Sequence, residues 1–103
     1  MTSSEQLYIH RKQLYVNKNE NQAIYFGYEL TLTKTEYLIL KAIADSSNSP
    51  LSAEQISAQT GIELSKENVA FHISSINKKA KIISNRTLIK NIAKIGYFLG
   101  EEI

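Results

Sequence analysis

The sequence predicts an α+β domain with an N-terminal four-stranded antiparallel sheet, three helices and a C-terminal β-hairpin. Short alternating apolar runs fill the first third of the chain. Helix-capping signals then begin at Thr33, Ser52 and Ser65. Two further β-type runs, 87–92 and 97–99, close the chain. A length of 103 residues, 43% of them hydrophobic, suits one core, so we expect a single domain over 1–103, with 1–6 and 100–103 as flexible tails.

The predicted sheet rests on alternation of apolar and polar residues. Leu7 and Ile9 form one such run and Leu14 and Val16 the next, with residues 10–12 at the turn between them. Residues 23–26 and 29–32 form two more strands, joined at Gly27 and Tyr28. We interpret the aromatic side chains as packing residues rather than as a stacking platform for single-stranded nucleic acid, which would need one exposed face. They are Tyr8, Tyr15, Tyr25, Phe26 and Tyr28.

Two helices follow the predicted sheet. Thr33 and Glu36 have the spacing of a capping box, in which each side chain bonds the other residue's amide. The helix that they open has a broad apolar face, formed by Tyr37, Leu40, Ile43 and Ala44. Residues 45–50 end it, Ser52 caps a short helix over 53–60, and Gly61 ends that one. A third helix follows after a brief linker, as in a helix-turn-helix.

The third helix, about 66–82, has an apolar stripe and a polar face. The stripe consists of Val69, Ile73, Ile76, Ala80 and Ile83. The opposite face carries Glu67, Phe71, Ser74, Ser75, Lys78 and Lys81, flanked by Asn68, His72 and Lys79 on one side and by Asn77 on the other. This pattern fits either an ordinary surface helix or a recognition helix for DNA. The outward Phe71 and the hairpin that follows, which would be a wing, favour the second interpretation.

Charge is distributed unevenly along the chain. Residues 1–65 hold five Lys/Arg and seven Asp/Glu, whereas residues 66–100 hold seven Lys/Arg and a single acid, Glu67. A basic second half beside an acidic first half favours a surface that binds a polyanion. The alternative is that the lysines only keep the helix and the hairpin solvated.

Other functions have little support in the sequence. The two histidines, His10 and His72, lie on different elements, and there is no glycine-rich phosphate loop, so we expect no catalytic site, no cofactor and no metal. There is no cysteine, no apolar run of about 20 residues and no signal-peptide core. We therefore expect a cytoplasmic protein.

Three segments together resemble the OmpR/PhoB-type winged-helix DNA-binding domain over about residues 7–99. They are L-T-x-x-E-Y at 32–37, V-x-x-H-I-S-x-I-x-K-K at 69–79 and I-K-N-I-x-K-I-G-Y-F-L at 89–99. Ile73-Ser74 and residues 94–97 are closer to the ToxR/CadC-type branch, in which such a domain precedes a membrane helix. The chain would then be either a free-standing winged helix or the cytoplasmic part of a longer, membrane-anchored regulator.

The resemblance implies sequence-specific binding of double-stranded DNA by a bacterial, two-component-like transcription regulator. The helix at 66–82 would lie in the major groove, and the wing at 87–99 on the minor groove or the phosphates. The residues that it implies for DNA binding are Lys66, Asn68, Phe71, His72, Ser74, Ser75, Lys78, Lys79, Lys90, Asn91 and Lys94. Asn77 would take a further polar position on this face. RNA polymerase and a second copy of the chain on DNA stay open as further partners.

The sequence also differs from that family in ways that support an alternative. The third helix has no arginine, although arginine bound to guanine is the commonest specific contact in the major groove. Ala93 stands where the wing often has arginine, and Lys94 where it often has glycine. The alternative is a protein-interaction module that docks a regulator or RNA polymerase through Phe71. Phe71 itself would be covered by a thymine methyl group, by a partner protein, or by its own wing or sheet.

Overall fold

The computed structural model describes residues 8–46 and 49–100. The predictions on Leu7, on residues 1–6 and 101–103 as tails, and on residues 47–48 fall outside these ranges. Gly100 lies inside them: it is buried, and its amide donates a hydrogen bond to the carbonyl of Leu88 (2.9 Å). The predicted fold class is confirmed, because a four-stranded antiparallel sheet, three helices and a C-terminal hairpin form a winged helix-turn-helix.

The elements follow one another in the predicted order. The sheet consists of β1 (Tyr8–Arg11), β2 (Leu14–Asn17), β3 (Ala23–Tyr25) and β4 (Tyr28–Leu30), each paired with the next. The helices are α1 (Lys34–Asp45), α2 (Ala53–Thr60) and α3 (Lys66–Ser84). The wing consists of β5 (Ile89–Ile92) and β6 (Gly96–Leu99). Among the described residues, no helix combines the length and the apolar character needed to cross a bilayer.

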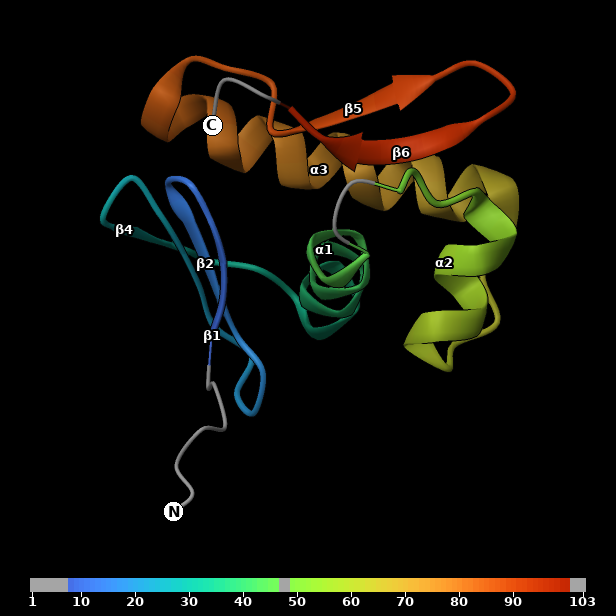
Figure 1. Cartoon of the computed structure of the whole chain (residues 1–103), viewed down its shortest axis with the longest axis horizontal. Helices are drawn as coiled ribbons and strands as arrows, with labels where there is room; N and C mark the ends of the chain where they lie inside the picture. The colour runs from blue at the N-terminus through green and yellow to red at the C-terminus, as the bar shows by residue number, and fades with distance from the viewer. Residues whose placement is uncertain (1–7, 47–48, 101–103) are drawn as a thin grey trace.

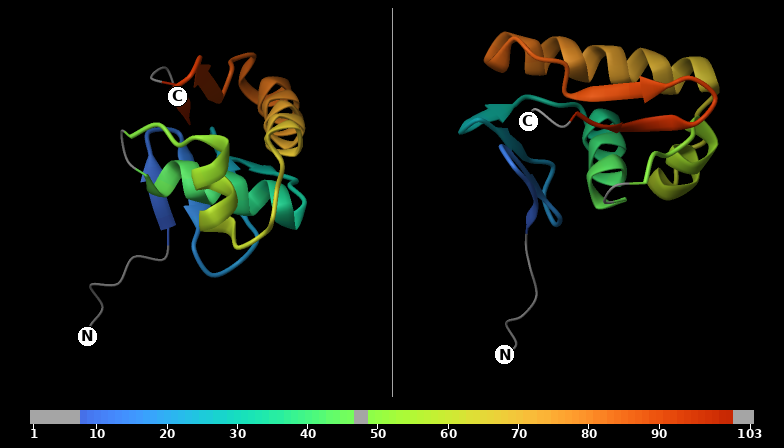
Figure 2. Two further views of the ribbon diagram at one scale, coloured as in Figure 1. Left: turned by 90° about the vertical axis from the view of Figure 1, so that its right-hand side faces the viewer. Right: turned by 45° about the horizontal axis from the view of Figure 1, so that its top comes forward.

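The first helix, α1, is the centre of the domain. It lies between the sheet on one side and α2 on the other, while α3 and the wing run together across one end (Figures 1 and 2). Leu40, Ile43 and Ala44 are buried, as the broad apolar face predicted. The predicted capping box is present, since Thr33 accepts from the amide of Glu36 and Glu36 accepts from the amide of Thr33. The sheet and α1 thus form a rigid base for α3.

Several predicted boundaries are corrected by one or two residues. His10 and Arg11 belong to β1, and the first turn is at Lys12, whose φ is +52°. The second tight turn is at Phe26 and Gly27, both with positive φ, rather than at Gly27 and Tyr28. Strand pairing decides both cases, because the ladder extends until the chain must reverse.

The interpretation of the aromatic residues is only partly confirmed. Tyr25 is fully buried, and Phe26 packs on the core. Tyr15 and Tyr28 are 40% and 66% exposed, so neither belongs to the core. On the outer face of the sheet, His10 stacks on Tyr15 (4.1 Å between ring centroids) and Tyr8 meets the same ring edge-on. These rings cover one another, because residues directly opposite on paired strands project from the same face.

The wing is attached to the segment between α1 and α2. Leu51 and Tyr97 exchange two backbone hydrogen bonds, of 2.9 Å and 2.7 Å. Gly96 lies so close to this segment that a Cβ atom would stand 2.5 Å from the carbonyl oxygen of Leu51, and its φ is +151°. Only glycine fits this position, which explains the glycine in the resemblance motif.

Candidate nucleic-acid interface

The third helix presents the polar face that its spacing predicts. Ser65 caps it by accepting from the amide of Asn68 (3.1 Å). Its apolar stripe lies in the core through Val69, Ile73, Ile76 and Ala80. The helix continues to Ser84, two residues beyond the predicted end, and stops at Asn85 in the left-handed region (φ +61°). The outward face is therefore carried on a helix that the core holds firmly.

Most of the predicted site residues on this helix are exposed to solvent. They are Lys66, Asn68, Phe71, Ser74 and Lys78. The side chain of Phe71 is 69% exposed, and its described ring contact is a T-shaped one with the half-buried His72, at 5.5 Å between centroids. The wing and the sheet therefore leave Phe71 uncovered, and the explanation that the domain itself covers it is wrong.

Two predicted site residues turn toward α1 instead of outward. Lys79 forms a salt bridge of 2.6 Å with Glu36, whose side chain is only 5% exposed. Burial raises the pKa of Glu36, but hydrogen bonds from Lys79, Ser75 and the Thr33 amide outweigh that effect and leave the pKa below its ordinary value. Glu36 is thus an ionised anchor that joins the start of α1 to α3. The sequence predicts Ser75 on the outward face and Lys79 on its flank; both instead bond Glu36, because a buried carboxylate needs partners.

Asn77 is also engaged within the domain. Its side-chain amide donates to the carbonyl of Ile89 (3.0 Å) and accepts from the amide of Ile89 (2.8 Å). It therefore holds the first residue of the wing rather than facing outward, and its expected outward role is corrected. Sequence reasoning missed this contact, because the partner is backbone, which has no sequence signature.

The wing carries the remaining predicted site residues. Lys90 is half-buried, whereas Asn91 and Lys94 are exposed. Lys94 has a φ of +69° at the third position of a turn closed by a hydrogen bond from the amide of Ile95 to the carbonyl of Ile92 (2.9 Å). A type II turn requires positive φ at this position and favours glycine there, which explains why Lys94 stands where glycine is frequent.

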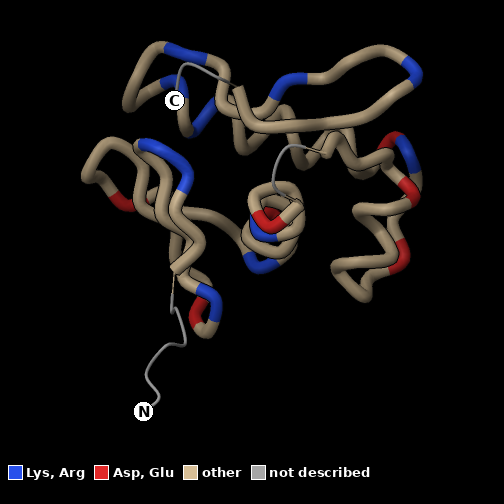
Figure 3. Tube along the Cα trace, viewed as in Figure 1, with Lys and Arg blue, Asp and Glu red and all other residues tan. Residues whose placement is uncertain are grey.

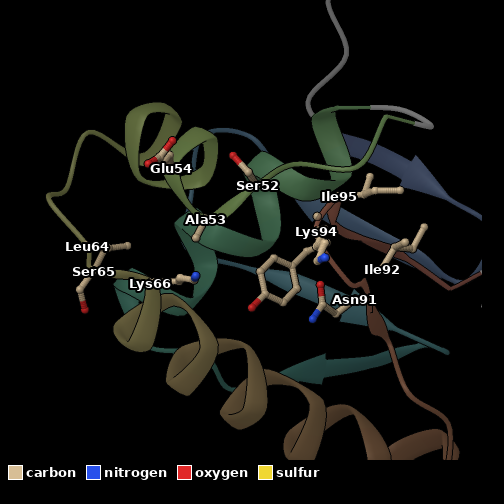
Figure 4. Close-up of a pocket in the computed structure, with 12 residues that line it drawn as sticks. Ser52, Ala53, Glu54, Leu64, Ser65, Lys66, Asn91, Ile92, Lys94 and Ile95 are labelled. Carbon is tan, nitrogen blue, oxygen red and sulfur yellow. The ribbon is translucent and has the colours of Figure 1, made fainter.

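Open grooves lie on the surface beside the wing and α3. One, of about 390 Å³, is lined by Lys78 and Lys81 of α3, by Asn91 of the wing and by Thr87, which precedes the wing. The other, of about 610 Å³, lies where the wing tip meets the starts of α2 and α3. In Figure 4, Lys66 from α3 and Lys94 from the wing both face this second groove. The structure thus brings predicted site residues from two elements to one surface.

Charge divides this end of the molecule into two parts. Lysines and arginines follow the C-terminal half of α3 and the wing, while glutamates gather around α2 and the start of α3 (Figure 3). Those acids are Glu54, Glu63 and Glu67, all exposed. In the described ranges, no group of His, Cys, Asp and Glu side chains is arranged to hold a metal ion. The surface can therefore attract a polyanion along α3 and the wing, but less so beside α2.

The fold defines the chain as a winged helix-turn-helix domain, and solved structures share it. The DNA-binding domain of CpxR from E. coli superposes with a TM-score of 0.75 at 23% identity, over 91% of this chain and 96% of that one. The DNA-binding domain of CadC from E. coli gives a TM-score of 0.75 at 23% identity, over 94% of each chain. The DNA-binding domain of Klebsiella pneumoniae RstA, solved in complex with the RstA box, gives a TM-score of 0.76 at 17% identity, over 93% of this chain and 99% of that one.

These neighbours confirm the expected resemblance for the fold. CpxR and CadC match equally well in identity and superposition, so the comparison favours neither branch of the resemblance. No protein-family model matches the sequence, and no curated protein sequence does either.

Proposed function

We propose that this domain binds double-stranded DNA as part of a transcription regulator of the OmpR/PhoB or ToxR/CadC type. In this proposal α3 enters the major groove and the wing lies over the adjacent minor groove or its phosphates. The observation that carries the proposal is the shared surface of α3 and the wing. Exposed Ser74 and Lys78 of α3 line one groove with Asn91 of the wing, and Lys66 lines the other groove with Lys94. Phe71 is exposed on the same helix. Solved neighbours of the same fold include complexes with DNA.

The residues on this surface divide by role. The lysines would neutralise phosphates, which fixes the position of the protein but reads no sequence. Ser74 and Asn68 would offer hydrogen bonds to base edges, and Phe71 would contact the methyl group of thymine. Since α3 carries no arginine, we expect a preference for A·T-rich sites over guanine-rich ones.

A binding curve at several salt concentrations tests the proposal. Each phosphate that is neutralised adds ~0.9 to the slope of log affinity against log salt. With Lys79 occupied by Glu36, roughly four cations on α3 and the wing can reach one duplex, so we expect a slope on the order of −4. A single-stranded oligonucleotide of the same sequence serves as the control and should bind more weakly.

The second candidate is a protein-interaction module, and the exposed apolar side chains favour it. Phe71, Ile82 and Ile95 are 69%, 86% and 57% exposed. A docking surface centred on Phe71 would bind its partner with little dependence on salt, because apolar burial is weakly screened. Absence of salt-dependent duplex binding would put this candidate first.

A further inference from the structure

We infer that Asn77 is a positioning residue that fixes the wing against α3 and reads no base. The inference rests on the proposed function, since it concerns how the two DNA-binding elements are held together. It assigns to Asn77 a role inside the domain, although the resemblance implies a polar position for it on the outward face.

The geometry of the contact carries the inference. The Asn77 side chain bonds both backbone groups of one residue: its NH2 group donates to the carbonyl of Ile89, and its carbonyl oxygen accepts from the amide of Ile89. A side chain that bonds both groups of one residue takes the place of a neighbouring strand. Ile89 is itself 2% exposed and is the first residue of β5. Its position is therefore fixed by its side chain in the core and by its backbone on α3.

Other hydrogen bonds among the described residues join β6 to the segment between α1 and α2 and close the base of the hairpin. Tyr97 of β6 bonds Leu51, and the amide of Gly100 bonds Leu88. These contacts fix β6 and the base of the hairpin, whereas Asn77 joins β5 directly to α3. Because both strands are attached, the wing is held in a fixed position relative to α3 in the free protein.

The consequence concerns the lysines beside this contact. Lys78 follows Asn77 on α3, and Lys90 follows Ile89 on β5. The two hydrogen bonds therefore set how far apart the helix and wing cations lie. A wing held in place loses little conformational freedom when it binds, whereas a loosened wing must be ordered at that moment. Removing the side-chain amide would also leave a backbone donor and acceptor of Ile89 without their partners.

Amide hydrogen exchange in the free protein tests the contact itself. In Asn77→Ala we expect the amide of Ile89 to exchange at least tenfold faster, with the amides of α1 unchanged. Ser74→Ala, a change on the exposed face of the same helix, is the matched control and should leave Ile89 protected. Unchanged protection of Ile89 in Asn77→Ala would overturn the inference. If Asn77→Ala does not fold, Asn77→Leu keeps a side chain of similar size, lacks both the donor and the acceptor, and allows the same measurement.

A double-mutant cycle on duplex DNA tests the positioning role. Lys94→Ala in the otherwise unchanged protein should flatten the salt slope by about one unit. In the Asn77→Ala background we expect that effect to fall to half or less, because the wing no longer lies in place. Lys94→Ala combined with Ser74→Ala should instead be additive, as for sites without shared partners.

The outcomes separate the inference from the proposed function. Additivity of Asn77→Ala with Lys94→Ala, or a loss confined to one base position, would overturn the positioning role while leaving DNA binding intact. Failure of the unchanged protein to bind any duplex would overturn the proposed function, and hydrogen exchange at Ile89 would still test the contact.

Discussion

The side chain of Phe71 separates the two candidate functions. A phenylalanine left in water forgoes on the order of 2 kcal/mol of burial, and here it is 69% exposed on the proposed DNA-binding face. The thymine methyl group is the apolar group that the major groove offers on base edges. Phe71 therefore should contribute to binding and contribute nothing to folding.

Replacing Phe71 with alanine tests this assignment. We expect Phe71→Ala to leave the free energy of unfolding within about 0.5 kcal/mol of the original and to remove the preference for thymine. The measurement compares a thymine-rich duplex with the same duplex carrying uracil, which lacks the methyl group, for both proteins. An unfolded variant would place Phe71 in the core. A variant that folds and binds both duplexes as before would move the contact to a protein partner.

Adjacent lysines on α3 have opposite roles in the structure. Lys78 is exposed and lines the groove that Asn91 of the wing also lines, whereas Lys79 pairs with buried Glu36. Lys79→Ala should cost about 1–3 kcal/mol of stability, because Glu36 loses a charged hydrogen-bond donor, and should leave the salt slope unchanged. Lys78→Ala should leave stability unchanged and flatten the slope by about one unit. Urea unfolding and salt titration of both variants check this, and identical behaviour of the two would contradict it.

At the scale of the elements, we expect the contact between α1 and α3 to depend on pH. Partners on α3 and the Thr33 amide hold the pKa of Glu36 below its ordinary value. The stability that ionised Glu36 contributes to the fold is therefore complete above the unfolded-state pKa, about 4.3. It is lost as the pH falls through the lower folded-state pKa. Urea unfolding between pH 7 and pH 3 should show a steeper loss of stability in the original protein than in Glu36→Gln. If stability falls with pH equally in the two proteins, Glu36 is not the cause of the loss at low pH.

The wing requires a glycine at its junction with Leu51. A methyl group at Gly96 would stand 2.5 Å and 2.6 Å from the carbonyl oxygen and carbon of Leu51. Gly96→Ala should therefore destabilise the domain by more than about 2 kcal/mol, through both overpacking and strain. Gly27→Ala is the matched control: φ is +80° but the space is open, so only the conformational cost of about 1 kcal/mol applies. Thermal unfolding compares the two, and equal losses would show that the close approach is unimportant.

For the whole molecule, the small number of available cations limits affinity. The longest helix, α3, has 19 residues, which is about 28 Å, so its terminal charges cannot all reach one turn of the groove. The acids around α2 also repel phosphates at one end of the surface. One copy should therefore bind DNA weakly. We also expect the protein to bind a duplex with two sites more tightly than a duplex with one site.

Gel-shift or fluorescence titration with duplexes of one and two sites checks this expectation. Two copies on one duplex bind with an advantage only if they contact each other or share a bend in the DNA. A single copy that binds tightly to a one-site duplex at physiological salt would contradict the expected weak binding, and would require contacts beyond the cations described.

The sequence alone determined the order of elements, the helix caps and the core. Thr33, Ser52 and Ser65 act locally, because each cap bonds an amide within three residues, and the stripe through Val69 and Ile73 follows from helical period alone. Only the tertiary structure decided which polar residues of α3 face outward. Ser75, Asn77 and Lys79 are as polar as Ser74 and Lys78, but a buried carboxylate on α1 and the backbone of Ile89 engage them. Those partners lie 12 to 43 residues away, where no local pattern can indicate them, so fewer polar side chains of α3 are available on its outward face than the sequence suggested.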